Sequence, residues 1–155
     1  MKFLKDKSVR LFVILTGFFL TNVFIAEFIG IKIFSLEETL GLSKFQFSFF
    51  GKDDLSFDLT AGVLLWPFVF VLTDVVNEYF GRRGVRMMSL LAVAMIIYAF
   101  IMFYLGIKLV PASWWPETQA VDGIPDMNSA FAAVFGQGLW IIGGSLVAFL
   151  VGQVL

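Results

Sequence analysis

Cysteine and histidine are both absent from the 155 residues of this chain. Without them the chain cannot form disulfides, use a thiol or a Ser–His pair as a nucleophile, or bind zinc through Cys and His. Charge is also scarce, since only 15% of the residues are charged and the net charge is −1. Because no basic excess is available to attract phosphates, we predict no nucleic-acid partner. We also predict neither a bound metal nor a cofactor.

Apolar residues, by contrast, are abundant. They make up 59% of the chain, and 20 of them are Phe. A typical soluble domain is nearer half apolar and a quarter charged. A domain of this size leaves a large fraction of its surface exposed, so it could not hide this much apolar area from water. The composition therefore predicts that lipid surrounds much of the chain.

Four apolar stretches are long enough, or nearly long enough, to cross a bilayer as helices. A hydrocarbon core about 30 Å thick requires about 20 apolar residues of helix. We predict spans at about 11–33, 59–80, 85–108 and 128–155, within a single membrane domain of residues 1–155. The first stretch is too long for a signal peptide and lacks a small-residue cleavage site. The predicted fold class is all-α, a polytopic bundle of membrane helices.

The distribution of Lys and Arg predicts the orientation. The N-terminal tail has four of these residues, and the short link between the second and third spans has three, namely Arg82, Arg83 and Arg86. The other two links, with their flanks, have four. Because cytoplasmic loops are enriched in Lys and Arg, this difference of seven to four places the N-terminus in the cytoplasm.

The two predicted outer loops differ in character. The first alternates polar and apolar residues over 44–49 and again over 55–58, with Gly51 and two Asp between. A period of two with such an interruption is typical of a small β-hairpin. A loop that dips its Phe side chains into the membrane interface fits the pattern equally well. The second outer loop contains Trp114 and Trp115, and Trp favours the headgroup layer.

Polar residues inside a span are costly and therefore mark candidate sites. The second predicted span holds the densest group, which consists of Thr73, Asp74, Asn77 and Glu78. Spacings of three and four residues place this group on one face of a helix, and we expect that face to point into the bundle. Pro67, upstream, cannot donate to the carbonyl of Val63, so we predict a helix kink there.

An alternative interpretation gives these polar residues a structural role, without a bound solute. Asp74 and Glu78 would then lie at the cytoplasmic end of the span, with nearby Arg residues as counter-ions. On a continuous helix Glu78 and Arg82 form a pair four residues apart in the favourable order.

Two other predicted spans add amide side chains. Asn22 is expected to hydrogen-bond a neighbouring helix, and Gln153 lies in the last span. Together with the polar group of the second span, these residues describe a cavity for a planar solute rich in hydrogen-bond donors. Two carboxylates on one helix do not face each other across a site, so we predict no enzyme activity.

Residues 66–81, followed by Arg86, strongly resemble the signature of the queuosine precursor transporter family. That family is a branch of the vitamin uptake transporters and is related to the substrate-binding subunits of energy-coupling-factor transporters. Its pattern is roughly F-P-x-x-F-x-x-T-D-x-x-N-E-x-Y/F-G, with an Arg shortly after. This chain matches with Pro67, Phe70, Thr73, Asp74, Asn77, Glu78 and Gly81, and has Trp66 in place of the usual Phe. The regions around Asn22 and 148–153 are similar as well.

The resemblance implies a function and a missing part. Family members have six spans, so the chain would hold the N-terminal two-thirds of such a protein. The implied function is import of 7-deazaguanines such as preQ0 and preQ1 across the bacterial inner membrane for queuosine salvage. The implied partners are this substrate, the lipid bilayer, and an energy-coupling module or a homo-oligomer. The alternatives are a subunit for another vitamin-like heterocycle and a scaffold that transports nothing.

Overall fold

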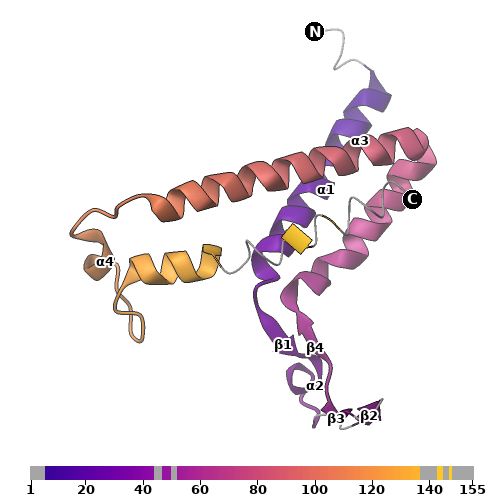
Figure 1. Ribbon diagram of the computed structural model, residues 1–155. Coiled ribbons are helices and arrows are strands. Elements are labelled where there is room, and N and C mark those ends of the chain that lie inside the picture. The colour runs from indigo at the N-terminus through magenta and orange to yellow at the C-terminus, as the bar shows by residue number, and fades with distance from the viewer. Residues whose placement is uncertain (1–5, 44–46, 50–51, 137–142, 145–146, 148–155) are drawn as a thin grey trace.

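The computed structural model describes residues 6–43, 47–49, 52–136, 143–144 and 147 (Figure 1). This part of the chain is mostly helical. Its helices are α1 (Lys7–Ile29), α2 (Leu36–Thr39), the 3-10 helix η2 (Ala61–Leu65), α3 (Trp66–Lys108), α4 (Trp115–Thr118) and the helix Met127–Gly136. Its strands are β1 (Ile33–Ser35), β2 (Phe47–Phe49), β3 (Lys52–Leu55) and β4 (Asp58–Thr60).

Two helical runs in the described residues, Lys7–Ile29 and Ala61–Lys108, are long and apolar enough to cross a membrane. Large apolar side chains cover their outer surfaces, as at Ile14 (67% exposed) and Val71 (61%). A surface of this kind is unfavourable in water and favourable in lipid. The helix Met127–Gly136 is also apolar but shorter, and most of the rest of the fourth predicted span, 128–155, lies outside the described residues.

The first helix lies four residues earlier than its predicted span at both ends. It begins at Lys7 because Asp6 caps it, with Asp6 Oδ1 accepting the backbone N–H of Ser8 at 2.8 Å. Capping satisfies a backbone donor that would otherwise lack a partner. The helix ends before Gly30. Hydropathy alone locates neither the Asp6 cap nor this C-terminal end.

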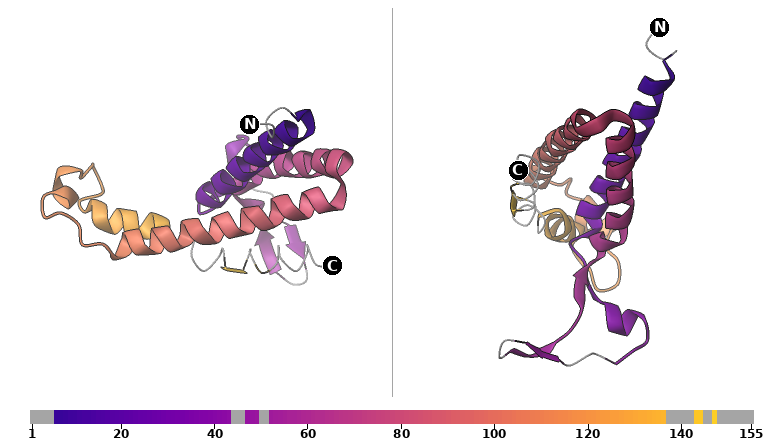
Figure 2. Two further views of the ribbon diagram at one scale, coloured as in Figure 1. Left: turned by 90° about the horizontal axis from the view of Figure 1, so that it is seen from above. Right: turned by 90° about the vertical axis from the view of Figure 1, so that its right-hand side faces the viewer.

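Gly81 divides α3 into two helical segments, 66–80 and 82–108. Its φ of 65° and ψ of −173° interrupt the helix, and the chain reverses direction there (Figures 1 and 2). Only glycine adopts this region readily, because it lacks a Cβ atom. Gly84 permits the close approach that follows, since an added Cβ would lie 2.5 Å from Phe80 Cβ.

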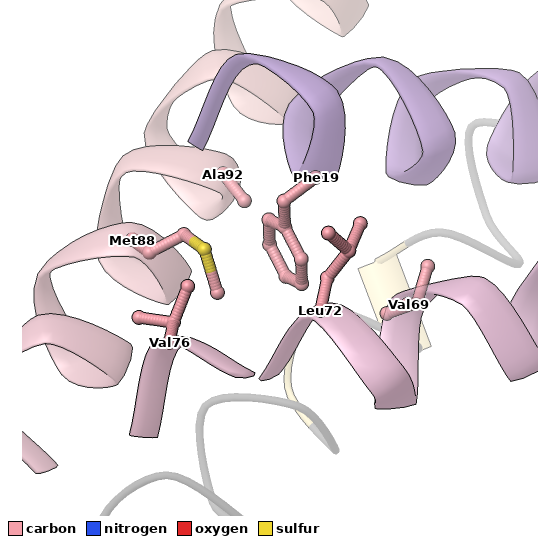
Figure 3. Close-up of a cluster of buried hydrophobic side chains, with 6 residues drawn as sticks. All are labelled: Phe19, Val69, Leu72, Val76, Met88 and Ala92. Carbon is pink, nitrogen blue, oxygen red and sulfur yellow. The ribbon is translucent and has the colours of Figure 1, made fainter. Parts of the chain in front are cut away.

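The core lies where α1 packs against both segments of α3. Phe19 of α1 is 1% exposed and inserts between the two segments (Figure 3). The buried residues around it are Val69, Leu72, Val76, Met88 and Ala92. Phe12 and Phe80 meet edge to face at 5.0 Å near the Gly81 reversal. Because lipid is as apolar as these side chains, close packing rather than water exclusion stabilises such an interface.

Two short antiparallel ribbons form the segment between α1 and α3 and extend away from the helices (Figure 2). β2 pairs with β3 inside the segment whose alternation is typical of a hairpin, with Phe47 opposite Leu55. β1 pairs with β4, with Ile33 opposite Thr60, and the sequence did not predict this ribbon. The fold is therefore mostly helical rather than purely α.

Glu37 of α2 connects the two sides of this loop. Its side chain is 2% exposed, and its Oε1 atom accepts the backbone N–H of Phe57 at 2.9 Å. In return, the carbonyl of Phe57 accepts the backbone N–H of Leu36 at 3.0 Å. A buried carboxylate is stable only where hydrogen bonds satisfy it, so this contact holds α2 in place.

Pro67 lies in the first turn of the α-helix of α3, directly after η2. The expected kink within an α-helix is therefore replaced by a change from 3-10 to α-helix. A proline is well tolerated in a first turn, where the backbone N–H groups have no helical acceptor. The non-helical backbone inside α3 is at Gly81 instead.

Candidate functional site

Asp74, Asn77 and Glu78 lie together on one face of the first segment of α3, and all three are exposed. The opposite face of the same segment carries Val69 and Val76, which are buried against α1 and the second segment of α3. The expectation that the polar face points into the bundle is therefore not met by the described helices. We call the face formed by Asp74, Asn77 and Glu78 the polar face.

The other candidate residues lie elsewhere. Thr73 is half-buried, and its hydroxyl donates to the carbonyl of Val69 at 2.8 Å. Asn22 is 6% exposed in the packed side of α1, and its Nδ2 donates to the carbonyl of Phe18 at 2.8 Å. The bond found for Asn22 is thus within its own helix, because a carbonyl one turn earlier is within reach of a short side chain. Gln153 lies outside the described residues.

The carboxylates of Asp74 and Glu78 lie at different distances from the Gly81 reversal. With a rise of 1.5 Å per residue, Asp74 lies about 10 Å along the helix from Gly81, and Glu78 about 4.5 Å. In the structural alternative, Glu78 and Arg82 are four residues apart on a continuous helix, but Gly81 interrupts the helix between them. Asp74 therefore lies farther from the Gly81 reversal than Glu78 does.

The chemistry available on the polar face is hydrogen bonding and charge. Two carboxylates accept hydrogen bonds and attract cations, and the Asn77 amide both donates and accepts. Within the described residues, no group of three or more Asp or Glu side chains is placed to hold a metal ion. The face is therefore suited to an organic solute with several N–H donors.

A cavity of about 150 Å³ lies at the end of α3 farthest from Gly81. We call it the end pocket. It is lined by Gly106, Leu109, Val110, Pro111, Trp115, Asn128 and Phe131. Sequence reasoning assigned Trp115 only to the headgroup layer and missed Asn128 and Phe131 altogether.

A helix cap fixes the position of Asn128. Asp126 precedes the helix, and its Oδ1 atom accepts the backbone N–H of Asn128 at 2.9 Å. The hydroxyl of Ser129 donates to the same carboxylate, and this bond, with those from the backbone, lowers the pKa of Asp126. Asp followed three residues later by Ser, ahead of an apolar run, is the sequence signal that locates this helix start.

A chain of Phe rings holds the same helix against α3 and α1. Phe131 and Phe135 are 4.7 Å apart, and Phe135 stacks on Phe103 of α3 at 4.9 Å. Phe103 in turn meets Phe28 of α1 edge to face at 5.3 Å. These contacts position Phe131 at the wall of the end pocket.

Two apolar helical runs of membrane-spanning length, with large apolar side chains on their outer surfaces, are typical of an integral membrane protein. Residues 60–155 match the family model described as "putative vitamin uptake transporter". The match takes in more than half of the chain, including the whole of α3, so the chain belongs to this family of vitamin uptake transporters. No curated protein and no solved structure matches the chain.

Proposed function

We propose that this membrane protein imports queuosine precursors, which are 7-deazaguanines, across the bacterial inner membrane. The observation that carries the proposal is the polar face of α3, which places two carboxylates and an amide on a helix of membrane-spanning length. The family match covers this helix and supports transport of a small molecule. The substrate itself is inferred from the chemistry of the face and from the resemblance of residues 66–81.

A 7-deazaguanine suits the polar face. The guanine-type edge presents adjacent N–H donors, and a carboxylate accepts two such bonds in parallel, so we assign this role to Asp74. Asn77, one turn away, adds a donor and an acceptor. A precursor that carries an aminomethyl cation would pair with the second carboxylate, Glu78. Thr73, Asn22 and Gln153 complete the proposed set, with Thr73 and Asn22 secondary because each donates locally.

The proposed architecture has four spans in this chain. α1 supplies one, the two segments of α3 supply two, and residues 128–155 supply the fourth, with the N-terminus in the cytoplasm. Lipid cannot hydrogen-bond the polar face, so further helices must cover it. We propose that the fourth span and two more helices of the full-length protein provide this cover, and that an energy-coupling module or a second copy supports transport.

Queuosine in tRNA provides the test. A bacterial strain that depends on salvage is grown with 7-aminomethyl-7-deazaguanine, with and without the full-length gene. We expect queuosine to appear only when the gene is present. Queuosine at the same level without the gene would contradict the proposal, and full rescue by the double variant Asp74→Ala, Glu78→Ala would favour a scaffold.

The alternative within the same family is a subunit that binds another vitamin-like heterocycle. The family match favours it as a second candidate, because the family description names vitamin uptake and no particular compound. Uptake of labelled 7-deazaguanine that an excess of other heterocyclic vitamins does not reduce would exclude this candidate.

A further inference from the structure

The end pocket is separate from the polar face, and the proposed function does not yet use it. Gly106, which lines the pocket, lies 25 residues after Gly81, which is about 37 Å along the second segment of α3. Lys108 ends the helix there, with its ammonium 5.6 Å from the centre of the Tyr104 ring, and Trp115 lines the pocket. Aromatic and basic residues of this kind mark the membrane–water interface. In the proposed orientation, the pocket therefore lies at the outer surface.

The walls of the end pocket are suited to a flat ring. Trp115 and Phe131 are both half-buried, so each presents part of an aromatic surface to the cavity. Planar heterocycles stack on such surfaces without strong dependence on their substituents. A cavity of about 150 Å³ has room for a single benzene-sized ring. The pocket therefore fits the ring face of a small heterocycle and leaves the remainder in water.

Asn128 supplies the polar contact. Its backbone N–H is occupied by Asp126, but its side-chain amide has no hydrogen bond to any part of the chain that the structure describes. A carboxamide presents a donor and an acceptor side by side, which matches the paired edge of a heterocyclic base. Among the described residues that line the pocket, Asn128 carries the amide, Trp115 has an indole N–H donor, and none is charged. This favours an uncharged, hydrogen-bonding edge over an anion.

We propose that the end pocket is an outer capture site, which binds one ring face and one amide-like edge of the heterocycle before the solute reaches Asp74. Trp115 and Phe131 stack the ring, and Asn128 bonds its edge. The inference rests on the proposed function and names the site at which that substrate first binds. Capture at low concentration lowers the half-saturation concentration of uptake without changing the later steps.

Gly106 offers a way to fill the pocket. A Cβ added there would lie 3.9 Å from Phe131 Cζ, an ordinary contact, so Gly106→Leu extends a side chain into the cavity. Gly136→Leu is the matched control. A Cβ at Gly136 would lie 3.9 Å from Ile107 Cδ1, and Gly136 does not line the pocket. Asn128→Ala removes the amide without adding volume.

Uptake of labelled 7-cyano-7-deazaguanine is measured with the full-length protein at matched expression. We expect Gly106→Leu to raise the half-saturation concentration about tenfold or more, and Asn128→Ala about three- to tenfold, with the maximal rate unchanged. Gly136→Leu should match the wild type. If the half-saturation concentration of Asn128→Ala is within about twofold of the wild-type value, the capture site is overturned. Asn128→Ala provides this test even if the Gly106→Leu protein does not accumulate in the membrane. If the wild type shows no uptake at all, the proposed function fails instead.

A lipid chain is the competing occupant, and Trp115 reports on it. The full-length protein, with its other Trp residues replaced by Phe, is placed in vesicles of brominated phosphatidylcholine. We expect 7-cyano-7-deazaguanine to change Trp115 emission saturably, and Asn128→Ala to weaken this response. If the brominated lipid chains strongly quench Trp115 emission, and the heterocycle does not reduce this quenching, then lipid occupies the pocket and the inference is overturned.

Discussion

Single residues with unusual backbone or unusual burial determine where this chain turns and where it presents polar groups. Gly81 combines a positive φ with open space around the position of a Cβ atom. Its role is therefore conformational rather than steric. Gly84, three residues later, has the opposite property, because a side chain there would collide with Phe80.

Replacing Gly81 with Ala should therefore destabilise the protein through backbone strain alone. We expect a loss of about 1–3 kcal/mol in the free energy of unfolding, measured by thermal or denaturant unfolding in detergent. Gly17→Ala is the control, because Gly17 is exposed within α1 and an added Cβ meets nothing within 4 Å. Ala favours a helix, so Gly17→Ala should be neutral or stabilising by up to about 1 kcal/mol. Equal stability of the two variants would show that the reversal tolerates a side chain.

The two carboxylates of the polar face should contribute unequally to uptake. Asp74→Asn replaces an acceptor with a donor at the position farther from the reversal, which should cost about 2–3 kcal/mol of binding, or roughly 30- to 150-fold in affinity. Glu78→Gln, close to the Gly81 reversal and to water, should cost less than about 1 kcal/mol. Uptake of labelled 7-deazaguanine by each full-length variant at matched expression provides the measurement. Normal uptake by Asp74→Asn together with no uptake by Glu78→Gln would reverse the two roles.

At the scale of secondary structure elements, the helices follow from local pattern and the strands do not. The apolar stretches between 59 and 108 predict helix, and Gly81 marks the interruption between them. The ribbon of β1 and β4 joins residues about 25 positions apart, a pairing that no local pattern specifies. Next to this ribbon, the buried carboxylate of Glu37 accepts the backbone N–H of Phe57 across the loop.

Glu37 should therefore stabilise the loop between α1 and α3. Glu37→Ala leaves the backbone N–H of Phe57 without its carboxylate acceptor, which should cost about 1–3 kcal/mol of stability. Glu37→Gln retains an oxygen acceptor at the same position and should cost less. Thermal unfolding in detergent, with limited proteolysis of residues 30–60, distinguishes the two variants. If Glu37→Ala melts and resists protease like the wild type, the contact with Phe57 does not support the loop.

For the molecule as a whole, the orientation in the membrane is the property that the distribution of charge predicts. The chain contains no Cys, so single cysteines can be introduced without background labelling. We expect Ser43→Cys to react with an impermeant thiol reagent from outside intact cells. Arg83→Cys should react only after the membrane is permeabilised, because the distribution of Lys and Arg predicts that the Gly81 reversal faces the cytoplasm. Arg83 is exposed, whereas a side chain at Gly84 would collide with Phe80. Labelling of Arg83→Cys alone in intact cells would invert the topology.

The amino-acid sequence by itself determined that the chain is suited to a membrane, that the first three apolar stretches are largely helical, and that Asp74, Asn77 and Glu78 share a face. Each of these properties depends on composition or on residues within one or two helical turns, so it can be predicted without the tertiary structure. Only the tertiary structure decided which face of α3 is covered, because that depends on the insertion of Phe19 from a distant helix. It likewise assembled the end pocket from Gly106, Trp115 and Asn128. Those residues come together through contacts between segments far apart in the chain, and such contacts have no local signature.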